Sequence, residues 1–429
     1  MRYVIIGNSA AAVGAIEAIR QHDRENPITV VADEPQHVYS RPLISYLLGG
    51  AVDETHMPYR PPDFYARNGV ETMLGVAATH VMPQESSVTL AGGETLAYDQ
   101  LLIATGGKPF VPPTPGIGLK GVFTFTRWDD ARRISRHIEE YCVEKALVVG
   151  GGLIGLKTTE ALMARSIQVT VVELADRILS ATFDHTASKL AESILQRHGA
   201  SIRTQMTVKE LVGGEDGRVN HAVLQDGECV DCGLVVVAIG VRPNVELIPP
   251  EAGIRINRGI LVDRRMQTSA SHVYAAGDCA EAYDLLLGDN RPIAIWPNAY
   301  QQGFVAGCAM AGGKREYEGG FPMNSVEVCG VPTISVGLTD PRDDADGYEI
   351  LERHDRGGQA YKRLVLCGDR LVGAICVGYI ERAGIYTGLI RDRVDVAPFK
   401  DHLLAGDFGL ISLPKAYRKH LVVGEGIEV

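Results

Sequence analysis

Three glycines in the middle of the sequence have the spacing of a dinucleotide-binding turn. Gly150, Gly152 and Gly155 follow the apolar run Ala146–Gly150 and precede a stretch with the pattern of an amphipathic helix. In such a turn the first glycine allows the tight bend, the second lets the backbone approach a pyrophosphate, and the third allows close helix–strand packing. The phosphates would bind the free N–H groups at the start of the helix. The sequence therefore predicts a dinucleotide site here.

Glu173 indicates which dinucleotide this site prefers. It ends the next apolar run, where a carboxylate accepts a hydrogen bond from the 2′-hydroxyl of the adenosine ribose. The same carboxylate would repel the 2′-phosphate of NADP(H), so NAD(H) is favoured, although Arg177 lies nearby in the sequence. Ile154 and Gly240 complete the set of residues that we assign to this site.

A related turn lies at the N-terminus. Gly7, Ser9 and Ala12 follow the first apolar run of the chain. These small residues leave the backbone open to a phosphate, and the Ser9 hydroxyl could add a hydrogen bond to it. Asp33 and Glu34 stand at the end of the following apolar run, and the sequence does not choose between them as the ribose ligand. The pattern predicts a second nucleotide site.

Each turn is flanked by two apolar runs and an amphipathic helix, which is a βαβ unit built twice. The Val- and Ile-rich runs indicate parallel strands that are buried on both faces. We therefore expect an α/β fold with two Rossmann-like dinucleotide-binding domains and a C-terminal α+β domain. We place the first domain at 1–115 and 245–320, the second at 116–244 and the C-terminal domain at 321–429. An antiparallel meander is expected at about 75–100.

Composition narrows the class of protein. The 429 residues include 42 Lys+Arg and 53 Asp+Glu, so the net charge is −11. No overall basic field exists to bind nucleic acid or an anionic membrane, and the apolar runs are far shorter than the ~18 residues of a membrane span. The N-terminus lacks the pattern of a secretory signal, so we expect a cytoplasmic protein with mostly reduced cysteines. Cys229 and Cys232 form a C-x-x-C without a second pair, so no metal site is expected.

The motifs together resemble a known superfamily. The chain is similar to the pyridine-nucleotide oxidoreductases with two dinucleotide-binding domains, and the matching pieces run in order from residue 1 to about 310. They are IIGNSAAAVGAIEAIR, DEPQHVYSRPLISYLLGG, LLIATGGKPFVPPTPG, VVGGGLIGL, VVELADRIL, AIGVRPN, VYAAGDCAE and WPNAYQQG. The resemblance is greatest to NADH-dependent rubredoxin- and ferredoxin-type reductases and to the flavoprotein part of nitrite reductases. It extends to NAD-linking flavoprotein subunits of complexes such as phenylglyoxylate dehydrogenase.

The resemblance implies that the N-terminal unit binds FAD. Gly7, Ser9 and Ala12 would then line its pyrophosphate, and Asp33 or Glu34 would contact the adenosine ribose. Further positions match FAD contacts of the superfamily. These are Arg41 for the phosphates or the flavin edge, Ala78 for the adenine, Thr105 and Gly106 for the turn beside the FAD, Asp278 for the ribityl chain, and Trp296 for the pyrimidine end of the isoalloxazine.

Two departures from the superfamily pattern narrow the reaction. Disulfide reductases and thiol peroxidases of the superfamily carry a redox cysteine near residues 40–50, and no cysteine precedes Cys142 here. Cys279 is interpreted as a packing residue. Relatives often place a lysine and a glutamate near flavin N5, where this chain has Tyr46 and Lys157. We predict that these two residues form the catalytic flavin edge and that Lys157 stabilises reduced flavin.

These observations predict an enzyme, an FAD-dependent NAD(H):acceptor oxidoreductase. Hydride would pass from nicotinamide C4 to flavin N5, and electrons would leave directly from the flavin. The expected acceptor is an iron–sulfur or rubredoxin-like protein or subunit, and the chain is expected to belong to an oligomer or complex. One alternative is an NADH oxidase that reduces O₂, and another is a redox-sensing FAD/NAD-binding module. A basic cluster at 415–420 is interpreted as a solvated helix face or a docking segment.

Overall fold

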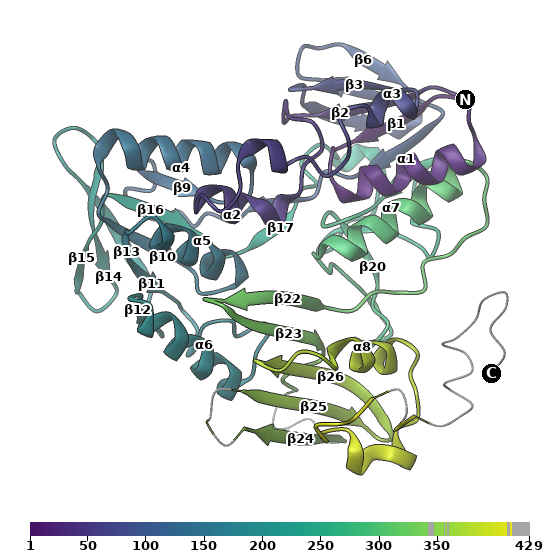
Figure 1. Ribbon diagram of the computed structural model, residues 1–429. Helices are drawn as coiled ribbons and strands as arrows, with labels where there is room; N and C mark the ends of the chain where they lie inside the picture. The colour runs from purple at the N-terminus through teal and green to yellow at the C-terminus, as the bar shows by residue number, and fades with distance from the viewer. Residues whose placement is uncertain (342–346, 356, 358–359, 410–411, 414–429) are drawn as a thin grey trace. The chain divides into compact units, whose positions relative to one another are not determined.

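The computed structural model describes residues 1–341, 347–355, 357, 360–409 and 412–413. The basic cluster at 415–420 lies outside these residues. The chain divides into two compact units, one of residues 1–174 and 206–320 and the other of residues 175–205 and 321–429. The second unit thus includes a segment from the middle of the region that we expected to bind NAD(H). Figure 1 shows the course of the chain.

The first unit is built around a parallel sheet with the strand order β19-β7-β1-β2-β3. The apolar run at the N-terminus forms β1, and all four of its side chains are buried, as expected for a central parallel strand. Helix α1 follows β1 and packs along α7 (Figure 1). The elements are β1 (Tyr3–Ile6), α1 (Ala10–His22), β2 (Ile28–Ala32), β3 (Val70–Leu74), β7 (Gln100–Ile103), β19 (Val273–Ala275) and α7 (Trp296–Met310).

The second βαβ unit repeats this arrangement. Strand β10 pairs in parallel with β11 on one side and β16 on the other, and β16 pairs in parallel with β9. Both predicted βαβ units are therefore present, and the predicted fold class is confirmed. The elements are β9 (Val122–Thr124), α4 (Trp128–Tyr141), β10 (Lys145–Val149), α5 (Leu153–Ala164), β11 (Gln168–Val172) and β16 (Leu234–Val237).

Small antiparallel sheets and short helices complete the first unit. The predicted meander is formed by β4, β5 and β6, and a two-stranded ribbon of β8 and β17 connects the two parallel sheets. The elements are α2 (Ile44–Leu48), α3 (Phe64–Arg67), β4 (Ala78–Met82), β5 (Ser87–Leu90), β6 (Thr95–Ala97), β8 (Gly107–Pro109), β13 (Val208–Gly213), β14 (Val219–Leu224), β15 (Cys229–Asp231), β17 (Val241–Pro243), β18 (Ile260–Leu261), β20 (Ala280–Tyr283) and β21 (Asn290–Arg291).

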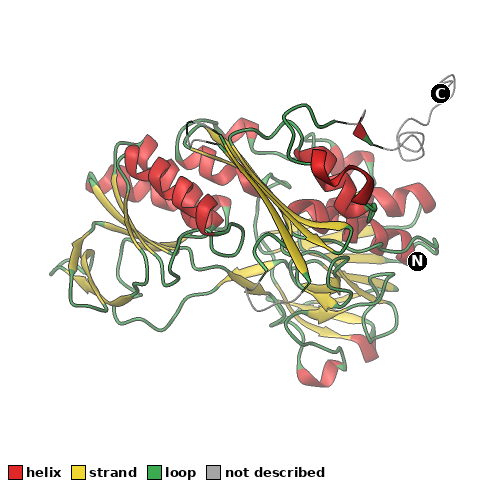
Figure 2. Cartoon of the chain, turned by 90° about the horizontal axis from the view of Figure 1, so that it is seen from below, coloured by secondary structure: helices red, strands yellow, loops and turns green. Residues whose placement is uncertain are grey.

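The second unit contains an antiparallel sheet with the order β22-β23-β26-β25-β24, whose long strands lie side by side in Figure 2. Helix α8 packs on β26 of this sheet, and α6 from the middle of the chain contacts β22. The elements are α6 (His185–Arg197), β12 (Ser201–Arg203), β22 (Met323–Val328), β23 (Val331–Gly337), β24 (Tyr348–His354), β25 (Tyr361–Cys367), β26 (Arg370–Val377) and α8 (Ala383–Arg391).

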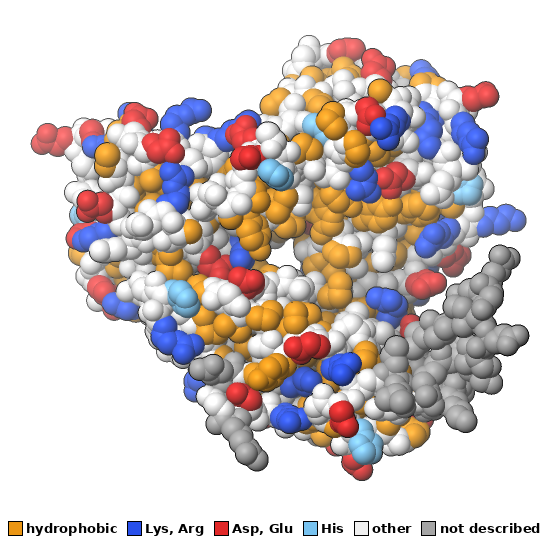
Figure 3. All heavy atoms as spheres, in the orientation of Figure 1, with side chains coloured by type: hydrophobic (Ala, Val, Ile, Leu, Met, Phe, Trp, Pro, Cys, Tyr) orange, Lys and Arg blue, Asp and Glu red, His pale blue; other side chains and the backbone are white. Residues whose placement is uncertain are grey.

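The surface agrees with the charge balance of the sequence. On the face shown in Figure 3, basic and acidic side chains are interspersed, and no broad basic field is visible. Among the described residues, no helix combines the length and the apolar character that crossing a membrane requires.

Candidate functional site

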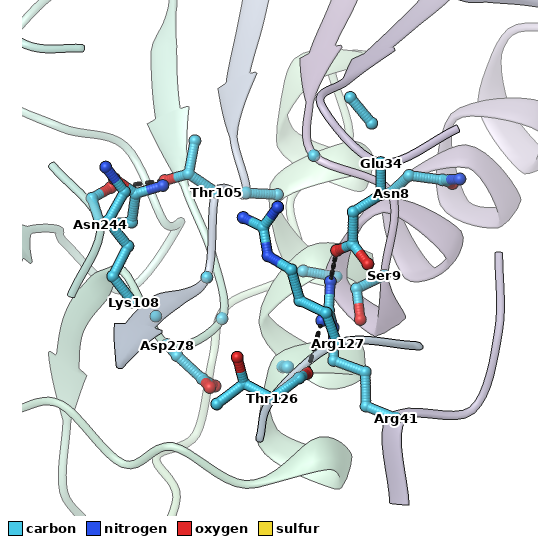
Figure 4. Close-up of a pocket in the computed structure, with 18 of the residues that line it drawn as sticks. Asn8, Ser9, Glu34, Arg41, Thr105, Lys108, Thr126, Arg127, Asn244 and Asp278 are labelled. Atoms are coloured by element: carbon cyan, nitrogen blue, oxygen red, sulfur yellow. Dashed lines mark hydrogen bonds and ion pairs between the residues drawn. The ribbon is translucent and has the colours of Figure 1, made fainter. Parts of the chain in front are cut away.

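A cavity of about 670 Å³ opens in the first unit where β1 and β7 end and α1 begins (Figure 4). Its volume lies in the range of sites that bind cofactors. Most residues assigned to the N-terminal nucleotide site line this one cavity. They are Gly7, Ser9, Asp33, Glu34, Arg41, Ala78, Thr105, Gly106, Asp278 and Trp296. Ala12 does not line the cavity but is fully buried beneath the turn.

The turn after β1 can be made only with glycine. Gly7 has φ +113°, and a Cβ at this position would lie 2.1 Å from the carbonyl oxygen of Ala104. Ser9 is the N-cap of α1, but its side chain makes no capping hydrogen bond, and no acidic residue lies in the first helical turn. The first N–H groups of a helix lack partners within the helix. This end of α1 is therefore suited to bind an anion such as a pyrophosphate.

The two candidate ribose carboxylates have different surroundings. Glu34 is buried, accepts a hydrogen bond from the Tyr39 hydroxyl at 2.5 Å and forms an ion pair with Arg41. Asp33 is half-exposed and pairs with Arg127 at 2.8 Å. Burial and the neighbouring Glu34 raise the pKa of Tyr39 well above its usual value, against the opposing effect of Arg41, so the Tyr39 hydroxyl keeps its proton and donates a hydrogen bond to Glu34.

Arg127 also lines the cavity and was not among the predicted site residues. It precedes α4 and lies 94 residues from Asp33 in the sequence, so no local motif indicates that the two pair. Figure 4 shows Arg127 and Arg41 as the two arginines beside Glu34. Both guanidinium groups thus lie at the cavity, and each is paired with a carboxylate at the end of β2.

Asp278 lies in the opposite wall of the cavity, and its carboxylate points inward (Figure 4). Burial raises the pKa of this carboxyl, while the positive charge of Arg41 acts in the opposite direction. Thr105 is fixed by a hydrogen bond from its hydroxyl to the Asn244 carbonyl at 2.6 Å. Cys279 is fully buried, and burial raises the pKa of its thiol, as expected for a packing residue. No cysteine is among the described residues that line the cavity.

The second glycine turn has the same geometry as the first. Gly150 has φ +110°, and a Cβ there would lie 2.5 Å from the Ala238 carbonyl oxygen. Gly152 is the N-cap of α5 and faces open space. Glu173 accepts a hydrogen bond from the Gly151 N–H at 2.6 Å, so its carboxylate is held against the turn. Gly240, which follows β16, also faces open space and has φ +109°.

The helix that follows the second turn reaches the cavity beside the first turn. Ile154, in the first turn of α5, lines the cavity that begins at the Gly7 turn. A ligand held at the second turn can therefore approach a ligand held in the cavity. Within the described residues, no three His, Cys, Asp or Glu side chains group as metal ligands would.

A sequence profile of pyridine nucleotide-disulphide oxidoreductases matches residues 1–303. The chain belongs to the pyridine nucleotide-disulphide oxidoreductase family. A second profile, the rubredoxin NAD⁺ reductase C-terminal domain, matches residues 322–394. The resemblance inferred from the motifs is thus confirmed. Members of this family are oxidoreductases that bind FAD and NAD(H).

Individual relatives match this chain over most of its length. The epsilon subunit of the NADH-dependent phenylglyoxylate dehydrogenase of Aromatoleum evansii is 34% identical over 407 residues, which are 94% of each chain. The rubredoxin-NAD(+) reductase of Pseudomonas putida is 30% identical over 73% of this chain and 80% of its own. The covalent putidaredoxin reductase–putidaredoxin complex contains a chain with 27% identity and a TM-score of 0.82, over 92% of this chain and 94% of that one.

The residues present fit the two cofactors of the family. The cavity offers a helix N-terminus and two arginines for the FAD phosphates and an inward carboxylate for sugar or ribityl hydroxyls. Tyr46 and Lys157 also come together in this family member, because α2 packs against α5. The Lys157 ammonium lies 5.1 Å from the centre of the Tyr46 ring and pairs with Glu160 at 2.6 Å. Neither Tyr46 nor Lys157 lines the cavity itself.

Proposed function

We propose that this chain is an FAD-dependent oxidoreductase that exchanges electrons between NAD(H) and a separate iron–sulfur or rubredoxin-like protein or subunit. The observation that carries the proposal is the adjacency of two glycine turns at a cavity whose described lining holds no cysteine. Without a thiol beside the flavin, electrons that enter from NADH leave from the flavin itself. The relationship to an NADH-dependent dehydrogenase subunit over 94% of both chains supports an acceptor that is part of the same complex.

FAD, when bound, supplies the centre that accepts a hydride from nicotinamide C4 and gives up electrons singly. The residues of this chain hold and orient it. We assign the pyrophosphate to the N-terminus of α1 with Gly7 and Ser9, and the ribityl chain to Asp278. Thr105 and Gly106 form the floor of the cavity, and Ala78 offers its backbone to the adenine. Trp296 covers the pyrimidine end of the ring.

We assign the FAD ribose to Asp33 rather than Glu34. Asp33 directly follows β2, as Glu173 directly follows β11, so the two carboxylates hold equivalent positions in the two βαβ units. Glu34 is already engaged by Arg41 and Tyr39. We therefore propose that Glu34 orients Arg41 toward the phosphates and that Asp33 exchanges Arg127 for the ribose hydroxyls.

We assign NAD(H) to the second turn, with Gly150, Gly152 and Gly155 at the pyrophosphate and Glu173 at the ribose. Ile154 separates the two cofactors at the cavity wall, and Gly240 leaves room for the nicotinamide half. Lys157 and Tyr46 do not line the cavity themselves, but Ile154 and Ile44, which precede them by three and two residues in the chain, do. From there the ammonium acts on the cofactors through its charge rather than by contact. We further propose that the enzyme acts in the cytoplasm, where NADH is available to it.

An anaerobic titration tests the proposed function. The purified chain should be yellow, and NADH should bleach it under argon, whereas NADPH should bleach it much more slowly. Steady-state turnover should be faster with a [2Fe–2S] ferredoxin or a rubredoxin than with O₂. Faster turnover with O₂ would identify an NADH oxidase instead. Bleaching by NADH without turnover on any acceptor would favour a redox-sensing module.

A further inference from the structure

The first unit contains a second hollow, separate from the cofactor cavity. It has a volume of about 450 Å³ and is formed by the C-terminal half of α4 and by residues 117–123, which include the start of the edge strand β9. We call it the α4 hollow. The described residues that line it all differ from those that line the cofactor cavity. Its volume lies in the range of small-molecule sites.

Three aromatic rings form one wall of the α4 hollow. The His137 ring contacts both Phe123 and Tyr141, with ring centroids 5.4 Å and 4.9 Å apart. His137 is buried, and its Nε2–H donates to the Gly233 carbonyl oxygen at 2.9 Å, because a carbonyl oxygen can only accept. Phe123 is half-buried and Tyr141 is exposed. The buried ring therefore fixes the wall, and the two outer rings offer surface to a ligand.

Glycines shape the opposite wall of the α4 hollow. Gly121 has φ +89°, and a Cβ there would lie 2.9 Å from His137 Nε2. A glycine at this position lets the loop before β9 approach α4 closely. Gly118 also lines the hollow, and no atom lies within 4 Å of the position that its Cβ would take. The hollow is thus open beside Gly118.

Positive charge gathers at the α4 hollow. Lys120, Arg133 and Arg136 line it and are exposed, and Glu140 is the one acidic residue among the described lining residues. In the described part of the chain, no carboxylate forms an ion pair with any of these three cations. Arg132 on the same helix, in contrast, is paired with two carboxylates and does not line the hollow. The lining side chains therefore carry a net charge of +2 in a chain whose overall charge is −11.

The charges and the rings lie together. The Arg133 guanidinium lies over the Phe123 ring, 5.4 Å from its centre. A guanidinium can bind a phosphate through two parallel hydrogen bonds, and a lysine adds a point charge. An exposed aromatic ring can stack against a planar base. The α4 hollow thus combines the two kinds of group that recognise the two halves of a nucleotide.

We infer that the α4 hollow binds a nucleoside monophosphate, with its base against Phe123 and Tyr141 and its phosphate at Lys120, Arg133 and Arg136. A phosphate monoester carries a charge of about −1.5 to −2 at pH 7, which matches the net charge of the lining. An aromatic carboxylate has one negative charge and would leave part of the positive charge unbalanced. The inference is independent of the proposed function, because it concerns neither glycine turn.

The α4 hollow and the cofactor cavity lie at opposite ends of one helix. Arg127, the N-cap of α4, lines the cofactor cavity, and Tyr141, its last residue, lines the hollow. A helix of 14 residues is about 21 Å long. A nucleotide in the hollow therefore does not touch the cofactors, and substitutions in the hollow should leave hydride transfer unchanged.

Calorimetric titration of AMP into the full-length, FAD-loaded chain tests the inference. The wild-type chain should bind AMP, and Arg133→Gln/Arg136→Gln should weaken this binding about tenfold or more, because two charge-assisted contacts to the phosphate are lost. AMP bound at the second glycine turn does not depend on these arginines, so only the binding lost in the variant belongs to the hollow. The variant should keep the wild-type Tm and the wild-type rate of flavin reduction by NADH.

Arg24→Gln is the matched control. Arg24 is an exposed arginine of the same unit and lines neither cavity, so its replacement should leave AMP affinity unchanged. Gly118→Glu tests the same site without removing a cation. Its carboxylate should repel the phosphate and weaken AMP binding about tenfold, and this variant decides if the arginine variant fails to load FAD.

Two fragments of AMP test whether both halves of the ligand are recognised. Adenosine lacks the phosphate and ribose 5-phosphate lacks the base, so each should bind at least about tenfold more weakly than AMP. Ribose 5-phosphate that binds as tightly as AMP would overturn the inference, because the rings would take no part. Absence of AMP binding by the wild-type chain at millimolar AMP, or unchanged AMP affinity in Arg133→Gln/Arg136→Gln, would overturn it as well. The proposed function would stand in each case if NADH still bleaches the flavin.

Discussion

The surroundings of two neighbouring carboxylates at the end of β2 decide which of them is available to bind a ribose. Asp33 and Glu34 are equivalent in the sequence, and the choice between them could not be made there. In the structure Glu34 is buried against Arg41 and Tyr39, while Asp33 is half-exposed. Burial and ion pairing depend on Tyr39, Arg41 and Arg127, and the partner of Asp33 is 94 residues away. No local pattern encodes such a distance.

We predict that Asp33→Asn and Glu34→Gln affect different properties, the first FAD binding and the second stability. Asp33→Asn should weaken FAD binding about tenfold, or ~1.4 kcal/mol, with little change in the Tm of the FAD-free protein. Glu34→Gln leaves Arg41 without its carboxylate partner in a partly buried site, so it should lower the stability of the FAD-free protein by about 2 kcal/mol. FAD titration by fluorescence and thermal unfolding measure the two effects. Unchanged FAD affinity in Asp33→Asn would contradict the assignment of the ribose to Asp33.

Glu173 is the residue for which the sequence was most informative. Its place at the end of β11 was predicted, and the structure adds that the Gly151 N–H holds its carboxylate at 2.6 Å. We predict that Glu173→Ala raises KM for NADH and narrows the preference for NADH over NADPH by about tenfold, because one charge-assisted hydrogen bond and one repulsion are lost. The measurement is the ratio of kcat/KM for the two cofactors. The exposed Glu144 provides a control as Glu144→Ala, which should leave the ratio unchanged.

At the scale of elements, both βαβ units were predictable because their turns are encoded locally. At the same place in each unit, Gly7 and Gly150 have φ above +100° and a backbone carbonyl oxygen close to the position that a Cβ would take. Ser9 and Ala12 replace two of the usual glycines in the first turn, but the strand and helix patterns on either side of the turn still predict a βαβ unit. The pairing of α2 with α5, which brings Tyr46 to Lys157, could be anticipated only through the family resemblance.

Gly7→Ala tests whether the turn between β1 and α1 is required for FAD binding. The new Cβ would lie 2.1 Å from the backbone oxygen of Ala104, which directly follows β7, so β1 and α1 must shift and FAD binding should be lost. Gly50→Ala is the matched control, because Gly50 has φ +76° but no atom lies within 4 Å of the position that its Cβ would take. That control should cost only about 1–2 kcal/mol of backbone strain and retain FAD. Retention of yellow colour by Gly7→Ala at wild-type stoichiometry would contradict the assignment of this turn.

At the scale of the whole molecule, the second unit joins a mid-chain segment to the C-terminal sheet through a polar cluster. Asp184, the N-cap of α6, accepts from Tyr361 at 2.8 Å and from Arg363 at 3.4 Å. Arg363 also donates to Glu352 at 2.6 Å. Asp184 and Tyr361 are 177 residues apart, so no sequence pattern indicates this cluster. Its members lie on a helix expected in one domain and on strands of another.

This cluster predicts a specific pH dependence of stability. Burial acts to raise the pKa of Glu352, but hydrogen bonds from Tyr361 and Arg363 outweigh it, and the net effect is a lowered pKa. A carboxyl whose pKa is lower in the folded state stabilises the fold above its unfolded pKa of about 4.3. That contribution is lost as the pH falls through the folded pKa.

Glu352→Gln should therefore lower the Tm at pH 7, and the difference from wild type should shrink toward pH 3. Because the Glu352 side chain is 36% exposed, the difference at pH 7 should stay at or below about 1 kcal/mol. Thermal unfolding of both proteins from pH 3 to pH 7 provides the measurement, and a Tm difference that stays constant over this range would show that Glu352 does not contribute through its charge.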